Sequence, residues 1–130
     1  MGEQLLFTKE HEWIKIDGDT ALIGITDYAQ SELGDIIFVE LPDVDDSFAN
    51  NDVFGTIEAV KTVADLFMPV SSKIIEVNSN IEDSPELINT HPQSDGWIVK
   101  VSIEDASELE SLLTLDEYKK MISKWVIILQ

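Results

Sequence analysis

One segment constrains the fold more than any other. Residues 55–70 are GTIEAVKTVADLFMPV, a mostly apolar run with a single lysine, Lys61. Ile57, Val60 and Ala64 fall at helical spacing, which would make Lys61 an ordinary solvated residue at the edge of a helix. Five β-branched residues disfavour that helix because their side chains lose rotamer freedom in it. They are Thr56, Ile57, Val60, Thr62 and Val63.

The alternative is a β-hairpin with paired arms at residues 53–58 and 64–68 and with Lys61 near the tip. A lysine on a tight turn projects a primary amine beyond the backbone on a four-carbon stem, and amide formation removes its charge. A carrier protein needs this geometry, but a solubilising lysine on a loop has the same local pattern. The pattern of residues favours the hairpin and leaves open whether Lys61 is modified.

The rest of the chain predicts a mainly β protein with a C-terminal helix. Strands are predicted at 13–16, 21–25, 36–41, 73–78 and 97–103, and helices at 27–34, at 84–89 and from residue 114 onward. Many short strands with glycine-marked turns and one terminal helix are typical of a β sandwich or barrel. The length of 130 residues fits a single domain, 1–130.

Local sequence signals predict where several of these elements begin and end. Gly18 is placed to supply a positive φ in the turn between the strands at 13–16 and 21–25. Asp27 is a candidate cap for the first helix, and Gly34 is placed to end it. Residues 36–41, IIFVEL, form a near-continuous apolar run, which predicts a buried strand. Thr114 and Glu117 have the spacing of a capping box at the start of the C-terminal helix.

The charge of the chain excludes several classes of partner. The sequence has 26 acidic residues against 8 basic ones, all lysine, and a formal net charge of -18. Nucleic acids and anionic membrane surfaces would be repelled by this charge, so we expect neither as a partner. Enzymes with basic docking surfaces fit better. The N-terminal residues lack the features of a targeting signal, so we expect a cytoplasmic protein or the mature form of an organelle protein.

No pattern of catalytic or metal-binding residues stands out. The sequence has no cysteine, so any sulfur chemistry must come from a cofactor. His11 lies between two glutamates, but the spacing does not fit HExxH and the other histidine, His91, is far along the chain. The acidic residues 43–52 lack the glycine and glutamate of a calcium loop that would start at Asp43. We therefore expect no metal site and no catalytic centre.

Six segments form an ordered set of motifs that spans most of the chain. They are FTKEHEW at 7–13, IGITDYAQSELGDIIFVELP at 23–42, FGTIEAVKTVADLFMPVS at 54–71, IIEVN at 74–78, EDSPELIN at 82–89 and DGWIVKV at 95–101. Together they resemble the glycine cleavage system H protein family over about residues 7–121. A lysine between two apolar arms also occurs in other lipoyl and biotinyl domains, so the order of all six motifs carries the resemblance.

The resemblance implies a flattened β sandwich of the lipoyl-domain type, a barrel-sandwich hybrid, with short helices and a C-terminal helix. It also implies lipoate joined to the ε-amine of Lys61. In this family the carrier takes an aminomethyl group from a pyridoxal-phosphate glycine decarboxylase to a tetrahydrofolate-dependent aminomethyltransferase. A dihydrolipoyl dehydrogenase then reoxidises it, and a lipoate ligase or octanoyltransferase attaches the cofactor. The protein would be a cosubstrate and not an enzyme.

The resemblance also implies roles for four other residues. Glu58 matches an acid that helps lipoylating enzymes recognise the hairpin. Glu12, Ile25 and Asp65 match positions that line the cleft into which the loaded arm retreats. The apolar tail at 125–129, WVIIL, has no counterpart in the family, and we expect it to pack on the sandwich or to mediate self-association.

Other functions remain compatible with the same hairpin. One is an H-like protein that relays lipoyl groups to other enzyme complexes, and another is a binding module that keeps the fold and leaves Lys61 bare. A biotin carrier fits less well because Lys61 lacks the flanking methionines of biotinyl domains.

Overall fold

The computed structural model describes residues 4–129, with side chains described for residues 4–123. Within this part the strands are β1 (Gln4–Phe7), β2 (Glu12–Asp17), β3 (Thr20–Ile25), β4 (Ile36–Glu40), β5 (Ser47–Phe48), β6 (Val53–Ala59), β7 (Val63–Phe67), β8 (Ser72–Val77) and β9 (Val99–Ile103). The helices are α1 (Asp27–Leu33), α2 (Asn80–Asp83), α3 (Leu87–Thr90), the 3₁₀ helix η1 (Ala106–Ser111) and α4 (Leu115–Leu129).

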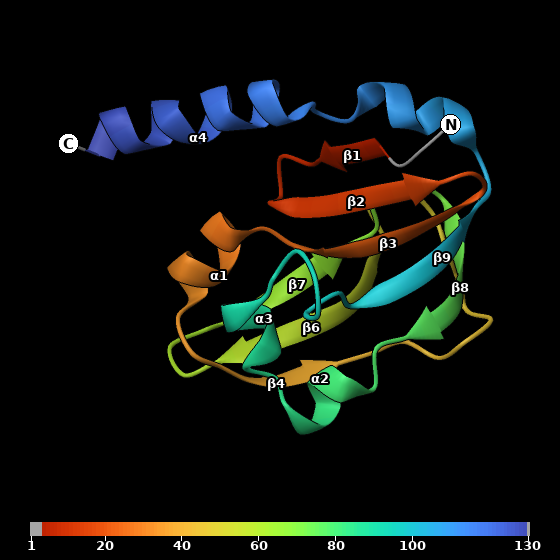
Figure 1. The fold of residues 1–130 in the computed structure, drawn as a ribbon, viewed down its shortest axis with the longest axis horizontal. Helices are drawn as coiled ribbons and strands as arrows, with labels where there is room; N and C mark the ends of the chain where they lie inside the picture. Colours follow the sequence, from red (N-terminus) through yellow and green to blue (C-terminus); the bar gives the residue numbers. More distant parts are fainter. Residues whose placement is uncertain (1–3, 130) are drawn as a thin grey trace.

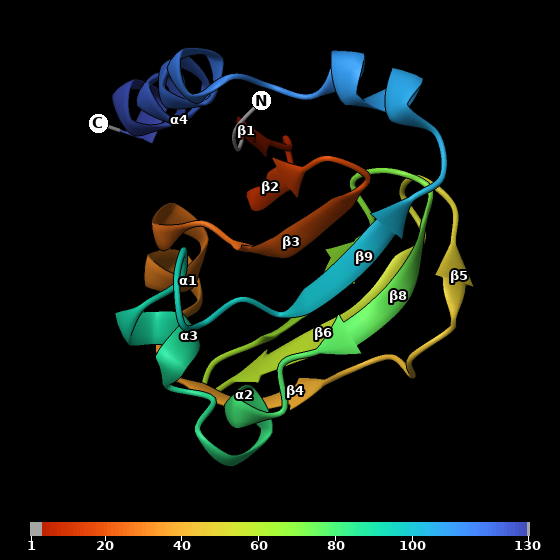
Figure 2. The ribbon, with the colours of Figure 1, turned by 45° about the vertical axis from the view of Figure 1, so that its right-hand side comes forward.

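The strands form two antiparallel sheets that pack against each other (Figures 1 and 2). The larger sheet has the order β1-β2-β3-β9-β8-β5, and the smaller has the order β4-β6-β7. Among the described strands the two sheets stay separate and do not close into a barrel. The prediction of a mainly β sandwich with short helices and a C-terminal helix is confirmed.

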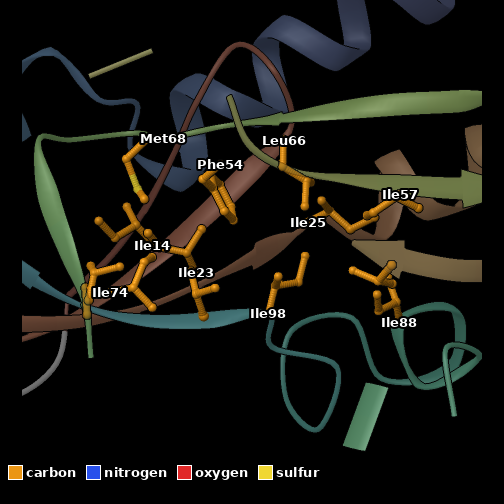
Figure 3. Close-up of a cluster of buried hydrophobic side chains, with 14 of the residues drawn as sticks. Ile14, Ile23, Ile25, Phe54, Ile57, Leu66, Met68, Ile74, Ile88 and Ile98 are labelled. Atoms are coloured by element: carbon orange, nitrogen blue, oxygen red, sulfur yellow. The ribbon is translucent and has the colours of Figure 1, made fainter. Parts of the chain in front are cut away.

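The main hydrophobic core fills the space between the two sheets. Ile14 and Ile23 come from the larger sheet, and they meet Phe54, Ile57 and Leu66 from the smaller one (Figure 3). All five are nearly or completely buried. The core therefore fixes the β6–β7 hairpin against the rest of the molecule through one of its two faces.

A second apolar cluster holds α4 on the other side of the larger sheet. Tyr118 of α4 packs with Phe7 and Trp13, and its ring stacks on Phe7 at a centroid distance of 4.9 Å. In Figure 1, α4 begins near one end of β1 and runs from there past α1. Gly24 makes room for the indole of Trp13, because a Cβ at this glycine would lie 2.7 Å from the ring. Within residues 4–129, no helix combines the length and the apolar character needed to cross a membrane.

Several local predictions are confirmed. Gly18 has φ 65° in the β2–β3 turn, and Gly34 has φ 80° at the end of α1. At the start of α4, the backbone N–H of Thr114 donates to Glu117 Oε1 at 2.9 Å, and the Glu117 N–H donates to Thr114 Oγ1 at 3.2 Å. These two bonds form the predicted capping box.

Three local predictions are wrong or need new bounds. The cap of α1 is Thr26, whose Oγ1 accepts from the Ala29 N–H at 3.2 Å, and not Asp27. The predicted helix at 84–89 begins later, since α3 spans Leu87–Thr90. The strand at 36–41 is not buried throughout, because Ile37 and Phe38 are both exposed. The side chains of the apolar tail, 125–129, lie outside the described residues.

Candidate functional site

Lys61 lies at the tip of a β-hairpin, as the β-branched residues around it predict. β6 and β7 pair antiparallel, with Glu58 opposite Val63, and the Ala59 N–H donates to the carbonyl of Thr62 at 2.8 Å to close the turn. The Val60 N–H donates to the carbonyl of Asp35 at 3.0 Å, which ties the tip to the segment before β4. The Lys61 side chain is exposed. The hairpin interpretation is confirmed, and the helical interpretation of this segment is wrong.

The tip lies beside the end of α1. A Cβ placed on Gly34 would be 4.0 Å from Cε of Lys61. Both views show the turn between β6 and β7 on the same side of the molecule as α1 (Figures 1 and 2). Leu33, the neighbour of Gly34 in sequence, lines a cleft between α1 and the hairpin. The amine-bearing side chain therefore lies at the rim of this cleft.

The cleft has a volume of about 450 Å³ and is formed by four separate segments. Its lining residues are Glu10, His11, Glu12, Ile25, Tyr28, Ala29, Glu32, Leu33, Ile57, Ala64, Asp65 and Leu66. The apolar members come from β3, α1 and the hairpin. The acidic members come from four places, with Glu10 before β2, Glu12 in β2, Glu32 in α1 and Asp65 in β7. The site thus combines an apolar interior with carboxylates, which suits a guest that has an alkyl chain and a cationic end.

Glu12 is the buried carboxyl of the cleft, with only 2% of its surface exposed. Its Oε2 accepts from the Phe67 backbone N–H at 2.8 Å, and its Oε1 accepts from the Thr8 hydroxyl at 3.1 Å. Burial raises the pKa of Glu12 to about 8, although these two hydrogen bonds favour the ionised form. Near neutral pH the carboxyl is therefore mostly protonated.

His11 connects the cleft to α4. Its Nδ1 lies 2.8 Å from the Tyr118 hydroxyl, which lies 2.7 Å from Oγ1 of Thr26. The imidazole also packs against Tyr28, with ring centroids 4.9 Å apart. Burial lowers the pKa of His11, against the opposite effect of the Glu10 and Glu32 carboxylates. His11 has φ 68°, an unusual backbone angle for a residue with a side chain, and this turn directs the chain into β2.

The residues predicted for the site divide into two groups. Glu12, Ile25 and Asp65 line the same cleft, although they come from three different strands. Lys61 is at the rim. Glu58 is exposed and is not among the lining residues. Along β6 it follows Ile57, which does line the cleft, and consecutive strand residues point to opposite faces.

Comparison with known proteins agrees with this arrangement. The family model for the glycine cleavage H-protein matches residues 5–125. The chain belongs to the glycine cleavage H-protein family. The crystal structure of a glycine cleavage system H protein from Mycobacterium marinum is similar, with 35% sequence identity and a TM-score of 0.81. The match covers 95% of this chain and 99% of that one, so the H-protein fold accounts for nearly all of the structure.

Sequence reasoning placed Glu12 of the motif FTKEHEW in the cleft but missed the parts that Thr8 and His11 play beside it. Within this motif, Glu12 accepts from the distant Phe67 N–H and His11 contacts the distant Tyr118 hydroxyl. Thr8 acts locally, since its hydroxyl donates to Glu12. The positive φ of His11 has no clear signal in the sequence. Among the described side chains, no group of three or more histidine, aspartate or glutamate residues is placed to hold a metal ion.

Proposed function

We propose that this chain is the lipoyl-bearing carrier of the glycine cleavage system, with lipoate attached through an amide to Nζ of Lys61. The observation that carries the proposal is the position of Lys61, exposed on a tight hairpin at the rim of a cleft with an apolar interior and acidic walls. Family membership supports it independently. In this role the chain is a cosubstrate that is acted on by other enzymes.

The proposal assigns the sulfur chemistry to the cofactor and the positioning to the protein. When bound, the lipoyl group supplies a dithiolane that accepts an aminomethyl group from a pyridoxal-phosphate glycine decarboxylase, delivers it to a tetrahydrofolate-dependent aminomethyltransferase and is reoxidised by dihydrolipoyl dehydrogenase. The absence of cysteine from the sequence agrees with this division. The tight turn presents Nζ to solvent, where partner enzymes have access.

The cleft residues fit the proposed cofactor. Ile25, Leu33 and Ile57 provide apolar contacts for an alkyl chain, and the cleft lies next to the lysine that would carry it. Glu12 and Asp65 would attract a cationic amine and keep it in a partly dry site away from water. In this proposal Glu12 and Asp65 hold the charge, and Ile25 shapes the apolar wall.

Glu12 has a protonation state suited to this task. An ammonium group in the cleft would lower the pKa of Glu12, because an opposite charge favours the carboxylate. The carboxyl would then release its proton and pair with the ammonium. With the cleft empty, the protonated form avoids the cost of an unpaired buried charge. The Phe67 N–H and the Thr8 hydroxyl hold both carboxyl oxygens in place.

Intact mass spectrometry tests the attachment site. Incubation with a lipoate ligase, lipoate and ATP should add the mass of one lipoyl group to the wild-type chain. Lys61→Arg should abolish the adduct, because arginine keeps the charge but lacks a reactive amine, and Lys73→Arg is the matched control. An adduct on Lys61→Arg, or none on the wild type, would contradict the proposal. Loading of the lipoylated chain by glycine and glycine decarboxylase then separates glycine cleavage from lipoyl relay.

A further inference from the structure

The outer surface next to Lys61 carries two consecutive exposed apolar side chains. Ile37 is 54% exposed and Phe38 is 53% exposed. In a regular strand they would point to opposite faces, so one of them would face the core. A β-bulge prevents this: Ile36 pairs with Ala59 and Phe38 pairs with Glu58, so β4 advances two residues while β6 advances one. The bulge turns both side chains outward.

These two residues continue an apolar surface on the hairpin. Phe38 lies opposite Glu58 in β6, and Glu58 lies opposite Val63 in β7, so the three form one row across the outer face of the sheet. Val63 is 61% exposed, and Val60 at the tip is 70% exposed. We call Ile37, Phe38, Val60 and Val63 the apolar collar. The collar borders Lys61, and Glu58 lies between two of its members, Phe38 and Val63.

The collar faces away from the cleft. Ile57 and Ala64, which line the cleft, form the next cross-strand pair and point to the opposite face of the hairpin. Exposed apolar side chains grouped in this way mark a binding surface when they adjoin a functional residue. The hydrogen bond from the Val60 N–H to the Asp35 carbonyl ties the hairpin tip to the segment before β4, so the collar residues of both elements lie side by side.

We propose that the apolar collar is the docking surface for the enzyme that acylates Lys61, and that Phe38 is its main apolar contact. The proposal rests on the function proposed above, because it needs Lys61 to be acylated. It concerns the step in which an activated lipoyl group reaches the chain. An amide bond forms between Nζ and the acyl carbon of the ATP-activated acyl adenylate, the bond from that carbon to the phosphate oxygen breaks, AMP leaves, and the ammonium nitrogen loses two protons.

Two features favour this enzyme over the other partners. The acylating enzyme must bring its active site to Nζ, at the end of a short four-carbon stem, so it must contact the hairpin closely. The enzymes that act on the lipoyl end meet a longer arm. The charge also fits, since Glu58 in the collar row and Glu40, two residues after Phe38 in β4, are acidic and would complement a basic rim around an apolar pocket.

Steady-state lipoylation by a lipoate ligase, with lipoate and ATP, tests the proposal. Phe38→Ser should lower kcat/KM for the protein substrate about tenfold, mainly through KM, as expected for loss of one buried aromatic contact. Val44→Ser is the matched control, since Val44 is 50% exposed and lies beyond the far end of β4. Its kcat/KM should stay within about twofold of the wild type, as expected for an exposed side chain outside the interface.

Further measurements make the outcome decisive. Thermal melting of Phe38→Ser checks the fold, and Val63→Ser probes the collar from a second strand. The lipoylated Phe38→Ser chain should be reduced by dihydrolipoyl dehydrogenase at the wild-type rate. Wild-type kcat/KM in both collar variants would overturn the docking proposal while leaving Lys61 as the attachment site. Failure of the wild type to be lipoylated would instead overturn the proposed function.

Discussion

The two faces of the β6–β7 hairpin have different partners. Ile57 and Ala64 point inward, where they meet residues brought from distant parts of the chain, such as Glu12 and Tyr28. The outer face is built locally, because the described part of the smaller sheet adds only β4 to the two strands of the hairpin. Because strand residues alternate between the two faces, the hairpin has two different surfaces. The inner face forms a cleft with distant segments of the chain, and the outer face depends only on the hairpin and the bulge in β4.

The largest difference between the faces should appear in stability. Ile57 is fully buried, so Ile57→Ala should lower the free energy of unfolding by about 2–4 kcal/mol. Val63→Ala, on the exposed face, should change it by less than about 0.5 kcal/mol. Denaturant unfolding of both variants measures the difference. If both variants lost the same free energy of unfolding, the outer face would also be packed, and the two faces would not differ as described.

The next largest effect concerns the buried carboxyl of the cleft. The pKa of Glu12 is raised from its ordinary 4.5 to about 8 in the folded chain. As the pH rises, Glu12 therefore loses its proton in the unfolded chain before it does so in the folded chain. The stabilisation is complete below pH 4.5 and is lost as the pH rises towards 8. Between pH 4.5 and 7 the loss of unfolding free energy due to Glu12 amounts to about 3 kcal/mol. Glu12→Gln, which mimics the protonated form, should remove this part of the pH dependence.

Glu58→Gln is the matched control, since Glu58 is an exposed carboxyl on the outer face. Its pH–stability profile should follow that of the wild type. In the function proposed above, Glu12→Gln should also shorten the lifetime of the aminomethyl-loaded carrier, because glutamine cannot become a carboxylate. If the pH–stability profile of Glu12→Gln matched that of the wild type, the raised pKa of Glu12 would be wrong. If the lifetime of the aminomethyl-loaded carrier were unchanged, Glu12 would not protect the loaded arm.

The hairpin and its lysine were predictable because their signals are local. β-branched residues define the arms, and Gly18 and Gly34 supply positive φ angles at the predicted turn and helix end. The choice of Asp27 as helix cap was wrong because Thr26 and Asp27 are adjacent and both are good caps. Only the backbone geometry distinguishes them.

The bulge and the cleft were less predictable, for different physical reasons. The run IIFVEL has no residue that marks a bulge, so alternation along it could not show that Ile37 and Phe38 share a face. The cleft needs contacts between segments far apart in sequence, such as the Phe67 N–H with Glu12. Family resemblance predicted that Glu12, Ile25 and Asp65 would come together, whereas periodicity and spacing carry no such information.

The smallest expected effect tests how strongly the cleft depends on its distant partners. Tyr118→Phe keeps the ring stacked on Phe7 but removes the hydroxyl that contacts His11 and Thr26. Burial raises the pKa of Tyr118, so this hydroxyl stays neutral and available for hydrogen bonding. Its loss should lower the free energy of unfolding by about 1–2 kcal/mol, since the buried Thr26 hydroxyl and the partly buried His11 ring lose a partner.

The comparison of the two faces predicts a selective result for Tyr118→Phe. Lipoylation by the ligase should proceed at the wild-type rate, because the outer face is built without α4. The chemical shifts of the His11 ring should change, and its titration midpoint should move, because the cleft face is held by this contact. Unfolding, histidine NMR titration and lipoylation kinetics on one preparation measure all three. If lipoylation slowed while the His11 resonances stayed unchanged, α4 would support the outer face instead, and the separation of the two surfaces would not hold.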